Sequence, residues 1–183
     1  MSTCIALIRG INVGQAKRVA MADLRRMLED MGHSNVRTLL NSGNAVFQTE
    51  RPKVRSAASA IEDQIVRRFG FQAAVVVITS GDLAEIIDGD PLGDVATDHA
   101  RHLVAFVSDP ASLSAAKPLL LSPWAPERFA LGSKAAYLWC PNGVIGSSLA
   151  QAFARLTADS ATMRNWSTVL KVQAAAGSRE ADI

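Results

Sequence analysis

Residues 36–48 read VRTLLNSGNAVFQ, and this stretch decides the fold of the first half of the chain. Val36 to Leu40 has the composition of a β-strand, Asn41 to Asn44 that of a tight turn, and Ala45 to Gln48 that of a returning strand. The stretch therefore predicts a β-hairpin.

The segments on both sides of this hairpin complete a supersecondary pattern. Thr3 to Ile8 is a short apolar strand, and Ala20 to Met31 places apolar residues at helical spacing, with Gly32 as its C-terminal cap. After the hairpin, a helix is predicted from Ser56, its N-cap, to Phe69, and a β-branched strand from Ala73 to Thr79. The order β-α-β-β-α-β predicts a ferredoxin-like arrangement, an antiparallel sheet with two helices on one face.

The second half of the chain repeats most of this topology. The predicted elements are, in order, a strand at 102–107, a helix at 110–117, a hairpin of 127–131 and 135–140, and a helix at 149–156. The closing strand of this second copy is expected to be missing. Residues 161–168 take its place and lead into a C-terminal helix with Thr162 as its N-cap.

The predicted fold class is α+β, with two ferredoxin-like subdomains of which the second is incomplete and followed by a C-terminal helix. The predicted boundaries are 1–80 for the first subdomain, 81–101 for a short helix and linker, 102–176 for the second subdomain with its helix, and 177–183 for a frayed tail. Asp82 is predicted to cap the short helix, which runs through Ile87.

The composition indicates a soluble globular protein. Nearly half of the 183 residues are apolar (49%), which is enough for a sizeable core. The apolar runs are too short to cross a bilayer, and the N-terminus lacks the basic start and apolar stretch of a secretory signal. The expected location is the cytoplasm, with no membrane partner.

Three motifs that lie far apart in the chain resemble those of one bacterial family. They are RGINVG at residues 9–14, SGN at residues 42–44 and TMRNWST at residues 162–168. In order and spacing they resemble the family catalogued as domain of unknown function 1697, from the first strand to about Val172. The resemblance implies an α+β protein with ferredoxin-like subdomains and no established activity. Three positions differ from the residues that the family often carries there: Cys4, Gln15 and Asn41.

The leading functional hypothesis is a small-molecule binding protein, which is an enzyme if the bound molecule reacts, with a composite polar site between the subdomains. In a βαββαβ sheet the first and third strands are neighbours, so the loop after the first strand and the hairpin turn can meet at one edge. A helix N-terminus at the third motif favours an anion. The predicted ligand is a small anionic or amide-rich molecule, and its predicted contacts are Arg9, Asn12, Ser42, Asn44, Arg164 and Asn165.

The same motifs have a structural explanation. Gly10 and Gly14 permit a positive φ at a bend while Asn12 bonds to the local backbone, and the Asn and Ser residues of a turn do the same. Trp166 then belongs to the core, and Arg164 ties the last helix to the first subdomain. In this alternative the protein is a structural or protein-interaction module. The glycines match neither the dinucleotide nor the phosphate-loop pattern.

Binding of single-stranded RNA is a third alternative, because ferredoxin-like sheets can present aromatic platforms to unpaired bases. Phe47 is the only aromatic residue of the first hairpin, and the lysine and aromatic pattern of such platforms is absent. The net charge of +2 is too small to indicate a nucleic-acid surface by itself. Tyr137 and Trp139 share one face of a strand, which favours covering the core or an interface. Nucleic acid is therefore not the expected partner, and an oligomer is permitted but not specified.

The sequence predicts no metal site and no cofactor. His99 and His102 are three residues apart beside Asp98, but they lie where the linker enters a strand and no further ligand is nearby in the sequence. Cys4 and Cys140 both lie in apolar strand-like segments, where a thiol packs as a small hydrophobic group. No hydrolytic triad or pair of carboxylates stands out.

Overall fold

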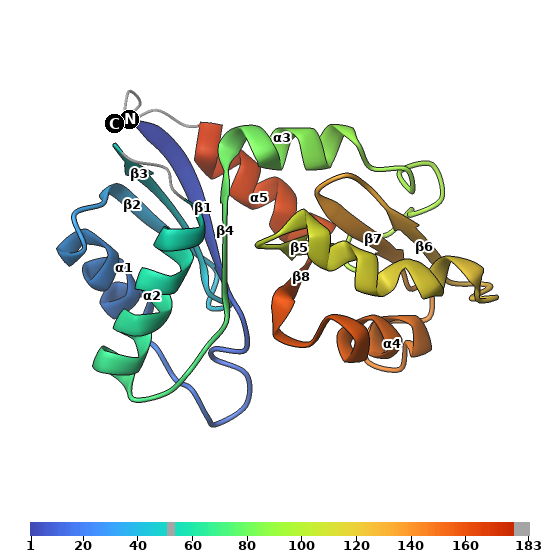
Figure 1. The fold of residues 1–183 in the computed structure, drawn as a ribbon, viewed down its shortest axis with the longest axis horizontal. Coiled ribbons are helices and arrows are strands. Elements are labelled where there is room, and N and C mark those ends of the chain that lie inside the picture. Colours follow the sequence, from blue (N-terminus) through green and yellow to red (C-terminus); the bar gives the residue numbers. More distant parts are fainter. Residues whose placement is uncertain (51–53, 178–183) are drawn as a thin grey trace. The chain divides into compact units, whose positions relative to one another are not determined.

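The chain folds into two compact units, each built around its own sheet (Figure 1). The computed structural model describes residues 1–50 and 54–177. The first unit is Met1–Leu83 with the C-terminal segment from Lys171, and the second is Ala84–Leu170. Each unit has a four-stranded antiparallel sheet with helices, which confirms an α+β protein with two ferredoxin-like subdomains. The predicted tail 177–183 lies, except for Gly177, outside the described residues.

The sheet of the first unit has the strand order β2-β3-β1-β4. Its strands are β1 (Ser2–Ile8), β2 (Ser34–Leu39), β3 (Asn44–Thr49) and β4 (Val75–Thr79). Helices α1 (Met21–Asp30) and α2 (Val54–Phe69) lie side by side on one face of it (Figure 1). The predicted hairpin and its neighbouring elements are therefore confirmed.

The core of the first unit forms between this sheet face and the two helices. Strand residues two apart point to the same face, and helix residues three or four apart do so as well. The buried side chains that meet there include Cys4, Ala6 and Ile8 of β1, Leu24, Met27 and Leu28 of α1, and Ala58, Ile61 and Ile65 of α2. Apolar periodicity in the sequence thus explains why α1 and α2 share one face.

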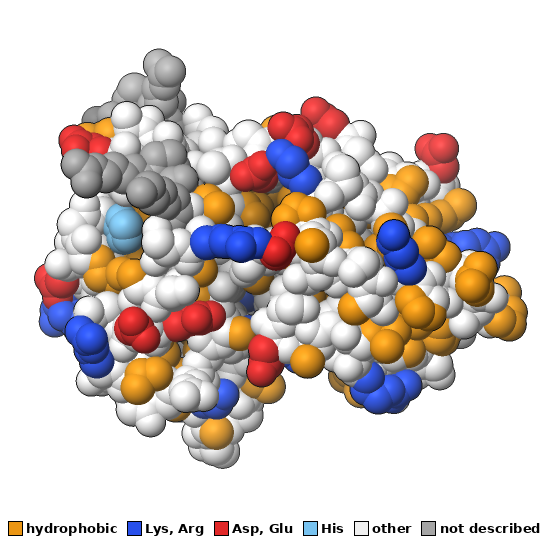
Figure 2. Space-filling view, viewed as in Figure 1, with side chains coloured by type: hydrophobic (Ala, Val, Ile, Leu, Met, Phe, Trp, Pro, Cys, Tyr) orange, Lys and Arg blue, Asp and Glu red, His pale blue; other side chains and the backbone are white. Residues whose placement is uncertain are grey.

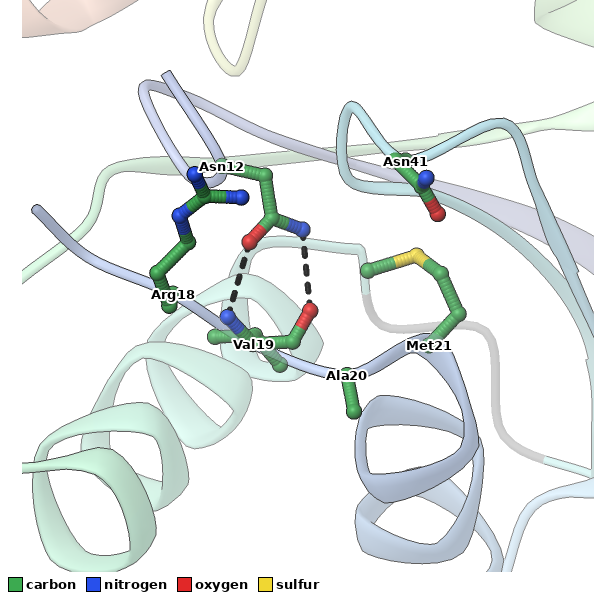
Figure 3. A pocket seen from close by; sticks show the side chains of 6 residues that line it. All are labelled: Asn12, Arg18, Val19, Ala20, Met21 and Asn41. Atoms are coloured by element: carbon green, nitrogen blue, oxygen red, sulfur yellow. Dashed lines mark hydrogen bonds between the residues drawn. The ribbon is translucent and has the colours of Figure 1, made fainter. Parts of the chain in front are cut away.

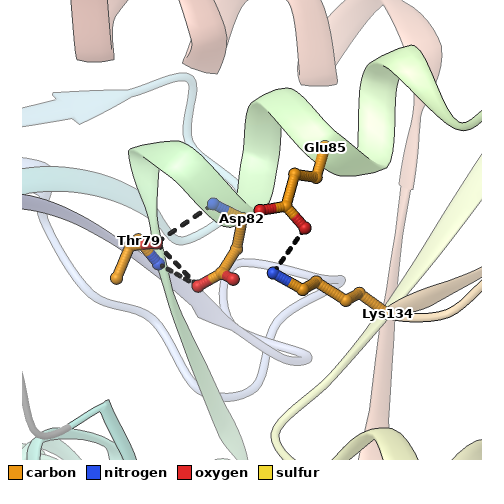
Figure 4. Close-up of polar contacts among 4 residues, drawn as sticks. All are labelled: Thr79, Asp82, Glu85 and Lys134. Carbon is orange, nitrogen blue, oxygen red and sulfur yellow. Dashed lines mark hydrogen bonds and ion pairs between the residues drawn. The ribbon is translucent and has the colours of Figure 1, made fainter.

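The ends of the helices agree with the sequence at one position and differ at two. Gly32, with φ +87°, ends α1 as predicted. Helix α3 (Ser80–Asp88) has Thr79 as its cap rather than Asp82: the Asp82 carboxylate accepts from the Thr79 N–H and hydroxyl, and the Asp82 N–H donates to the Thr79 Oγ1 at 3.0 Å (Figure 4). Ser56 is not the N-cap of α2, because it lies inside that helix.

The second unit repeats the order of elements with a different first helix. Its strands are β5 (His102–Val107), β6 (Arg128–Leu131), β7 (Ala135–Trp139) and β8 (Ala161–Asn165), in the sheet order β6-β7-β5-β8. Its helices are η1 (Pro110–Leu121), α4 (Ser148–Thr157), η2 (Ala158–Ser160) and the start of α5 (Trp166–Gly177). The helix predicted at 110–117 is a longer 3₁₀-helix with Pro118 inside it.

The second sheet is complete, so the expectation of a missing strand is wrong. β8 pairs antiparallel with β5, with Met163 opposite Ala105. Thr162 therefore lies in a strand and does not cap a helix. The cap of α5 is Asn165, whose Oδ1 accepts from the Thr168 N–H at 2.9 Å. The sequence does not show this strand clearly, because β8 is an edge strand that buries only its first two residues and therefore lacks a regular apolar pattern.

Both cysteines are free and buried, with Cys4 1% and Cys140 0% exposed. Burial raises the pKa of each thiol above its ordinary value. Large apolar side chains are exposed on the second unit, where Figure 2 shows hydrophobic groups over η1 and β6; Leu121 is 89% exposed. No helix within residues 1–50 and 54–177 is long and apolar enough to cross a membrane.

Candidate ligand-binding pocket

The loop that joins β1 to α1, residues 9–20, forms one wall of the candidate site. Its first residue is held by the segment that leads into β4, because the Arg9 N–H donates to the carbonyl of Ala74, the residue before that strand, at 2.9 Å. Gly10 and Gly14 have φ values of +70° and +64°, in the region that most residues avoid. The expected positive φ at both glycines is therefore confirmed.

Asn12 ties the two ends of this loop together (Figure 3). Its Nδ2 donates to the Val19 carbonyl at 2.9 Å, and its Oδ1 accepts from the Val19 N–H at 2.8 Å. Its backbone N–H donates to the Lys17 carbonyl at 3.0 Å. Asn12 has φ +57°, a conformation that Asn tolerates better than most residues. Residues 13–18 are thus a loop closed at its neck by one amide side chain.

The hairpin turn between β2 and β3 forms the second wall. Asn44 is fully buried, and its Nδ2 donates to the Leu39 carbonyl at 3.1 Å and to the Ser42 Oγ at 2.9 Å. The Gly43 carbonyl accepts from the Ile8 N–H at 2.7 Å. The end of β1 and the start of β3, the two central strands, therefore meet at the same end of the sheet, as the topology predicts.

A pocket of about 410 Å³ opens beside this loop and this turn (Figure 3). Figure 3 shows the Asn41 amide and the Met21 side chain facing each other across it. The described residues that line it are Asn12, Arg18, Val19, Ala20, Met21 and Asn41. Of the predicted contacts, Asn12 lines this pocket itself, and the 42–44 turn contributes through its neighbour Asn41.

The electrostatics of this pocket favour an anion. Arg18 brings a guanidinium, and none of the six described lining residues is acidic. Helix α1 begins at the pocket, and Ala20 at its N-cap gives its first N–H groups no side-chain acceptor. Asp23 in the first turn of α1 partly offsets this positive end. The arrangement has the chemistry to hold a carboxylate or phosphate group.

Arg164 and Asn165, the predicted contacts from the third motif, lie on β8 in the second unit. Arg164 donates to the Met163 carbonyl at 2.9 Å and to the Thr162 Oγ1 at 3.0 Å. Burial lowers its pKa to about 10, so the guanidinium remains charged at neutral pH. Asn165 caps α5. The ligand contacts assigned to these two residues, and to Arg9, Ser42 and Asn44, stay predictions.

Comparison with known proteins places the chain in a family. The family model described as protein of unknown function (DUF1697) matches residues 1–137. The chain belongs to the DUF1697 family. The fold of this DUF1697 protein resembles that of the conserved bacterial protein SP0830 from Streptococcus pneumoniae, with a TM-score of 0.78, 20% identity, and coverage of 96% of this chain and 98% of that one. No curated protein matches the sequence of this family member.

Two residues that line the pocket of this DUF1697 protein, Arg18 and Asn41, were not among the predicted contacts. The sequence does contain an indication that Arg18 has a role: a cation just before a helix lies near the positive end of the helix dipole, which is unfavourable for helix stability. Such a residue is explained more easily by a ligand or partner than by helix stability. Asn41 was predicted as part of the hairpin turn and as a departure from the family pattern, and its turn position alone does not show that it faces a pocket.

The second unit of this DUF1697 protein buries a histidine that the sequence placed near the linker. His102 is 1% exposed, and its ring stacks on Trp166 with 4.7 Å between centroids. Its Nε2 lies 3.4 Å from the Asp90 Oδ1 without forming a hydrogen bond. Nearby, the buried Tyr137 hydroxyl donates to the Ile86 carbonyl at 2.6 Å. Within residues 1–50 and 54–177, no three or more His, Cys, Asp or Glu side chains form a group that could hold a metal ion.

We expect the second unit to lose stability as the pH falls below 6.5. Burial lowers the pKa of His102; Asp90 opposes this effect, and His99 adds to it. The unfolded chain binds a proton near pH 6.5 and the folded chain does so at lower pH. The contribution of His102 is therefore fully present above pH 6.5 and is lost as the pH decreases toward the folded pKa. Urea unfolding followed by tryptophan fluorescence reports on this unit, because all three tryptophans lie in it.

The control for this pH dependence is a second histidine. Replacement of His102 with Gln should flatten the fluorescence-detected dependence between pH 7.5 and 5.5, a range of about one unit on each side of the ordinary histidine pKa. The pKa of His33, in the first unit, is also lowered by burial. His33→Gln should leave the fluorescence-detected dependence unchanged. An equally steep dependence in His102→Gln contradicts the assignment.

Proposed function

We propose that this DUF1697 protein binds a small anionic ligand in the pocket between residues 9–20 and the turn at 40–43. The observation that carries the proposal is a cavity of about 410 Å³ with a guanidinium and a helix N-terminus on its walls and no acid among its described lining residues. That volume suits a small molecule. The role of Arg164 and Asn165 as further contacts stays a prediction.

The chemistry of the lining residues suggests which groups the ligand carries. An arginine fork binds a carboxylate or phosphate through two parallel hydrogen bonds. Asn41 is exposed and offers an amide, which pairs well with an amide or hydroxyl group of the ligand. Asn12 mainly stabilises the loop, since its amide makes hydrogen bonds to the Val19 backbone. We therefore infer a small carboxylate or phosphate that also carries an amide or hydroxyl group.

The lining residues favour binding over catalysis. Neither a histidine, a cysteine, a serine nor a carboxylate is present among the described residues that line the pocket. These are the groups that usually supply a nucleophile or a general base. The proposal therefore assigns a binding function to the pocket.

A pair of matched probes tests the proposal. N-acetylglycine carries a carboxylate and an amide, whereas N-acetylglycinamide has nearly the same shape without the charge. We expect N-acetylglycine and inorganic phosphate to give saturable shifts of the Ala20 and Met21 amide signals in ¹H–¹⁵N NMR spectra. Arg18→Met should weaken binding of either anion about tenfold or more, because a charge-assisted hydrogen bond is worth about 1.5–3 kcal/mol.

Arg26→Met is the matched control, since Arg26 is an exposed arginine of α1 that does not line the pocket. It removes the same charge and should change the affinity by no more than about twofold, because salt screens the interaction of the ligand with an exposed charge that does not line the pocket. Equal responses to N-acetylglycine and N-acetylglycinamide would contradict an anion site. So would equal losses in Arg18→Met and Arg26→Met.

A structural or protein-interaction module is the second candidate, and specific contacts favour it. The amides of Asn12, Asn44 and Asn165 all bond to the chain itself, as they would if the motifs served only to fix the fold. The third candidate, RNA binding, has less support, since Phe47 and Tyr137 are buried and offer no stacking face to a base. Variants of Asn12 separate the first two candidates.

A further inference from the structure

The second unit contains a pocket of its own, of about 530 Å³. One wall is the segment 123–127, which leads into β6, and the other is the loop 142–148, which leads into α4. Both walls belong to the second unit, so this pocket is separate from the one beside Arg18. Its volume also falls in the range of small-molecule sites.

The apolar part of this pocket is an aromatic ring fixed in place. The Trp124 Nε1–H donates to the Leu119 carbonyl at 2.7 Å, which holds the half-buried indole at the end of η1. Pro123 and Pro126 line the pocket on both sides of it in the sequence. An indole face of this kind attracts a flat carbon skeleton or a cation.

The charged part of this pocket is Glu127. One carboxylate oxygen accepts from the Leu149 N–H at the start of α4, at 3.2 Å, which fixes the side chain. The Ser147 hydroxyl accepts from the Ala150 N–H at 2.9 Å, so the first turn of α4 already has its acceptors. None of the described lining residues is Lys, Arg or His. The pocket therefore repels an anion and presents a carboxylate beside an aromatic ring.

We propose that this pocket binds a small organic cation, a protonated amine or guanidinium attached to a flat or apolar skeleton. Glu127 pairs with the charge, and Trp124 contacts the cation or its skeleton. Asn142 and Ser148, both exposed lining residues, accept the remaining N–H groups. The proposal goes beyond the anion site of the first unit, because it concerns another cavity and a ligand of opposite charge.

Benzylammonium and benzyl alcohol test this proposal, because they have the same ring and differ in charge. We expect benzylammonium to shift the Trp124 indole N–H signal saturably, and benzyl alcohol to bind at least tenfold more weakly. Added salt should weaken the binding of benzylammonium, since an ion pair is screened. The titrations of the two probes use the wild-type chain, and assignment of the indole signal comes from Trp124→Phe.

Glu127→Gln is the decisive variant, because Gln keeps an acceptor for the Leu149 N–H and removes the charge. It should weaken benzylammonium binding at least tenfold while the far-UV circular dichroism stays native. Glu85→Gln is the charge-matched control: this carboxylate is 65% exposed, pairs with Lys134 at 2.7 Å and does not line the pocket (Figure 4). The proposal is overturned if no saturable shift occurs, if the alcohol binds as well as the amine, or if both glutamate variants lose binding equally.

Discussion

Gly43→Ala should destabilise the first unit by about 3 kcal/mol, the largest effect that we expect from a single methyl group. Gly43 has φ +76°, and a Cβ built on it would lie 2.8 Å from the Ile8 carbonyl oxygen and 3.0 Å from two side-chain atoms of Ile11. The Gly43 carbonyl accepts from the Ile8 N–H, so the two segments cannot separate without losing a hydrogen bond. Strain and overlap therefore add to each other.

Urea unfolding followed by far-UV circular dichroism measures this effect. All tryptophans and the single tyrosine lie in the second unit, so fluorescence gives a separate signal for that unit. Gly14→Ala is the matched control, since Gly14 has φ +64° but nothing lies within 4 Å of its added Cβ. We expect it to cost about 1 kcal/mol through backbone strain alone. Equal losses in the two variants would show that the close contact with Ile8 does not matter.

Asn12→Ala should have an effect of similar size, a loss of about 3 kcal/mol. It removes both hydrogen bonds to Val19, worth about 1 kcal/mol each, and places Ala at φ +57°, which adds about 1 kcal/mol of strain. Asn35→Ala is a matched control: Asn35 has φ +50°, but its side chain makes one exposed hydrogen bond, to Gln48. We expect about half the loss there, measured by urea unfolding.

The same Asn12 variant distinguishes the two candidate functions. If the loop carries a ligand site, Asn12→Ala should also weaken N-acetylglycine binding, because Arg18 sits on the loop that Asn12 closes. If the protein is a structural module, the variant loses stability while its response to N-acetylglycine and phosphate is as small as that of the wild type. The folded fraction at the titration temperature is checked by circular dichroism in both cases.

Much of the fold follows from local patterns in the sequence. The hairpin at 36–48 and the apolar faces of α1 and α2 were predictable because a half-buried strand and an amphipathic helix leave regular periods. The strand at Ala161–Asn165 was not, because its pairing with β5 is decided by tertiary contacts and most of its side chains are not buried. Thr79 was not predicted as a helix cap because it is also the last residue of β4, and α3 begins directly after it at Ser80.

The candidate pocket was predictable only in part. Topology correctly brings the loop after β1 next to the hairpin turn, and Asn12 lies where they meet. Whether a polar side chain faces a hollow or bonds to its own backbone depends on loop geometry, which residue type does not determine. Asn12 and Asn44 illustrate this, since their amides bond to the backbone of the loop and of the hairpin that form the walls of the pocket. The sequence does not indicate the pocket beside Glu127, because most of its lining residues are Pro, Gly, Asn and Ser, which are common in ordinary turns.

The two buried cysteines have a practical consequence for labelling. Alkylating reagents react with the thiolate, and both Cys4 and Cys140 are shielded from solvent and hold their protons more firmly than a free thiol. Val13, in the loop of residues 9–20, is 72% exposed. A thiol introduced by Val13→Cys would therefore accept a fluorophore or spin label selectively in the otherwise native chain, which places a spectroscopic reporter next in sequence to the pocket-lining Asn12 without any removal of natural cysteines.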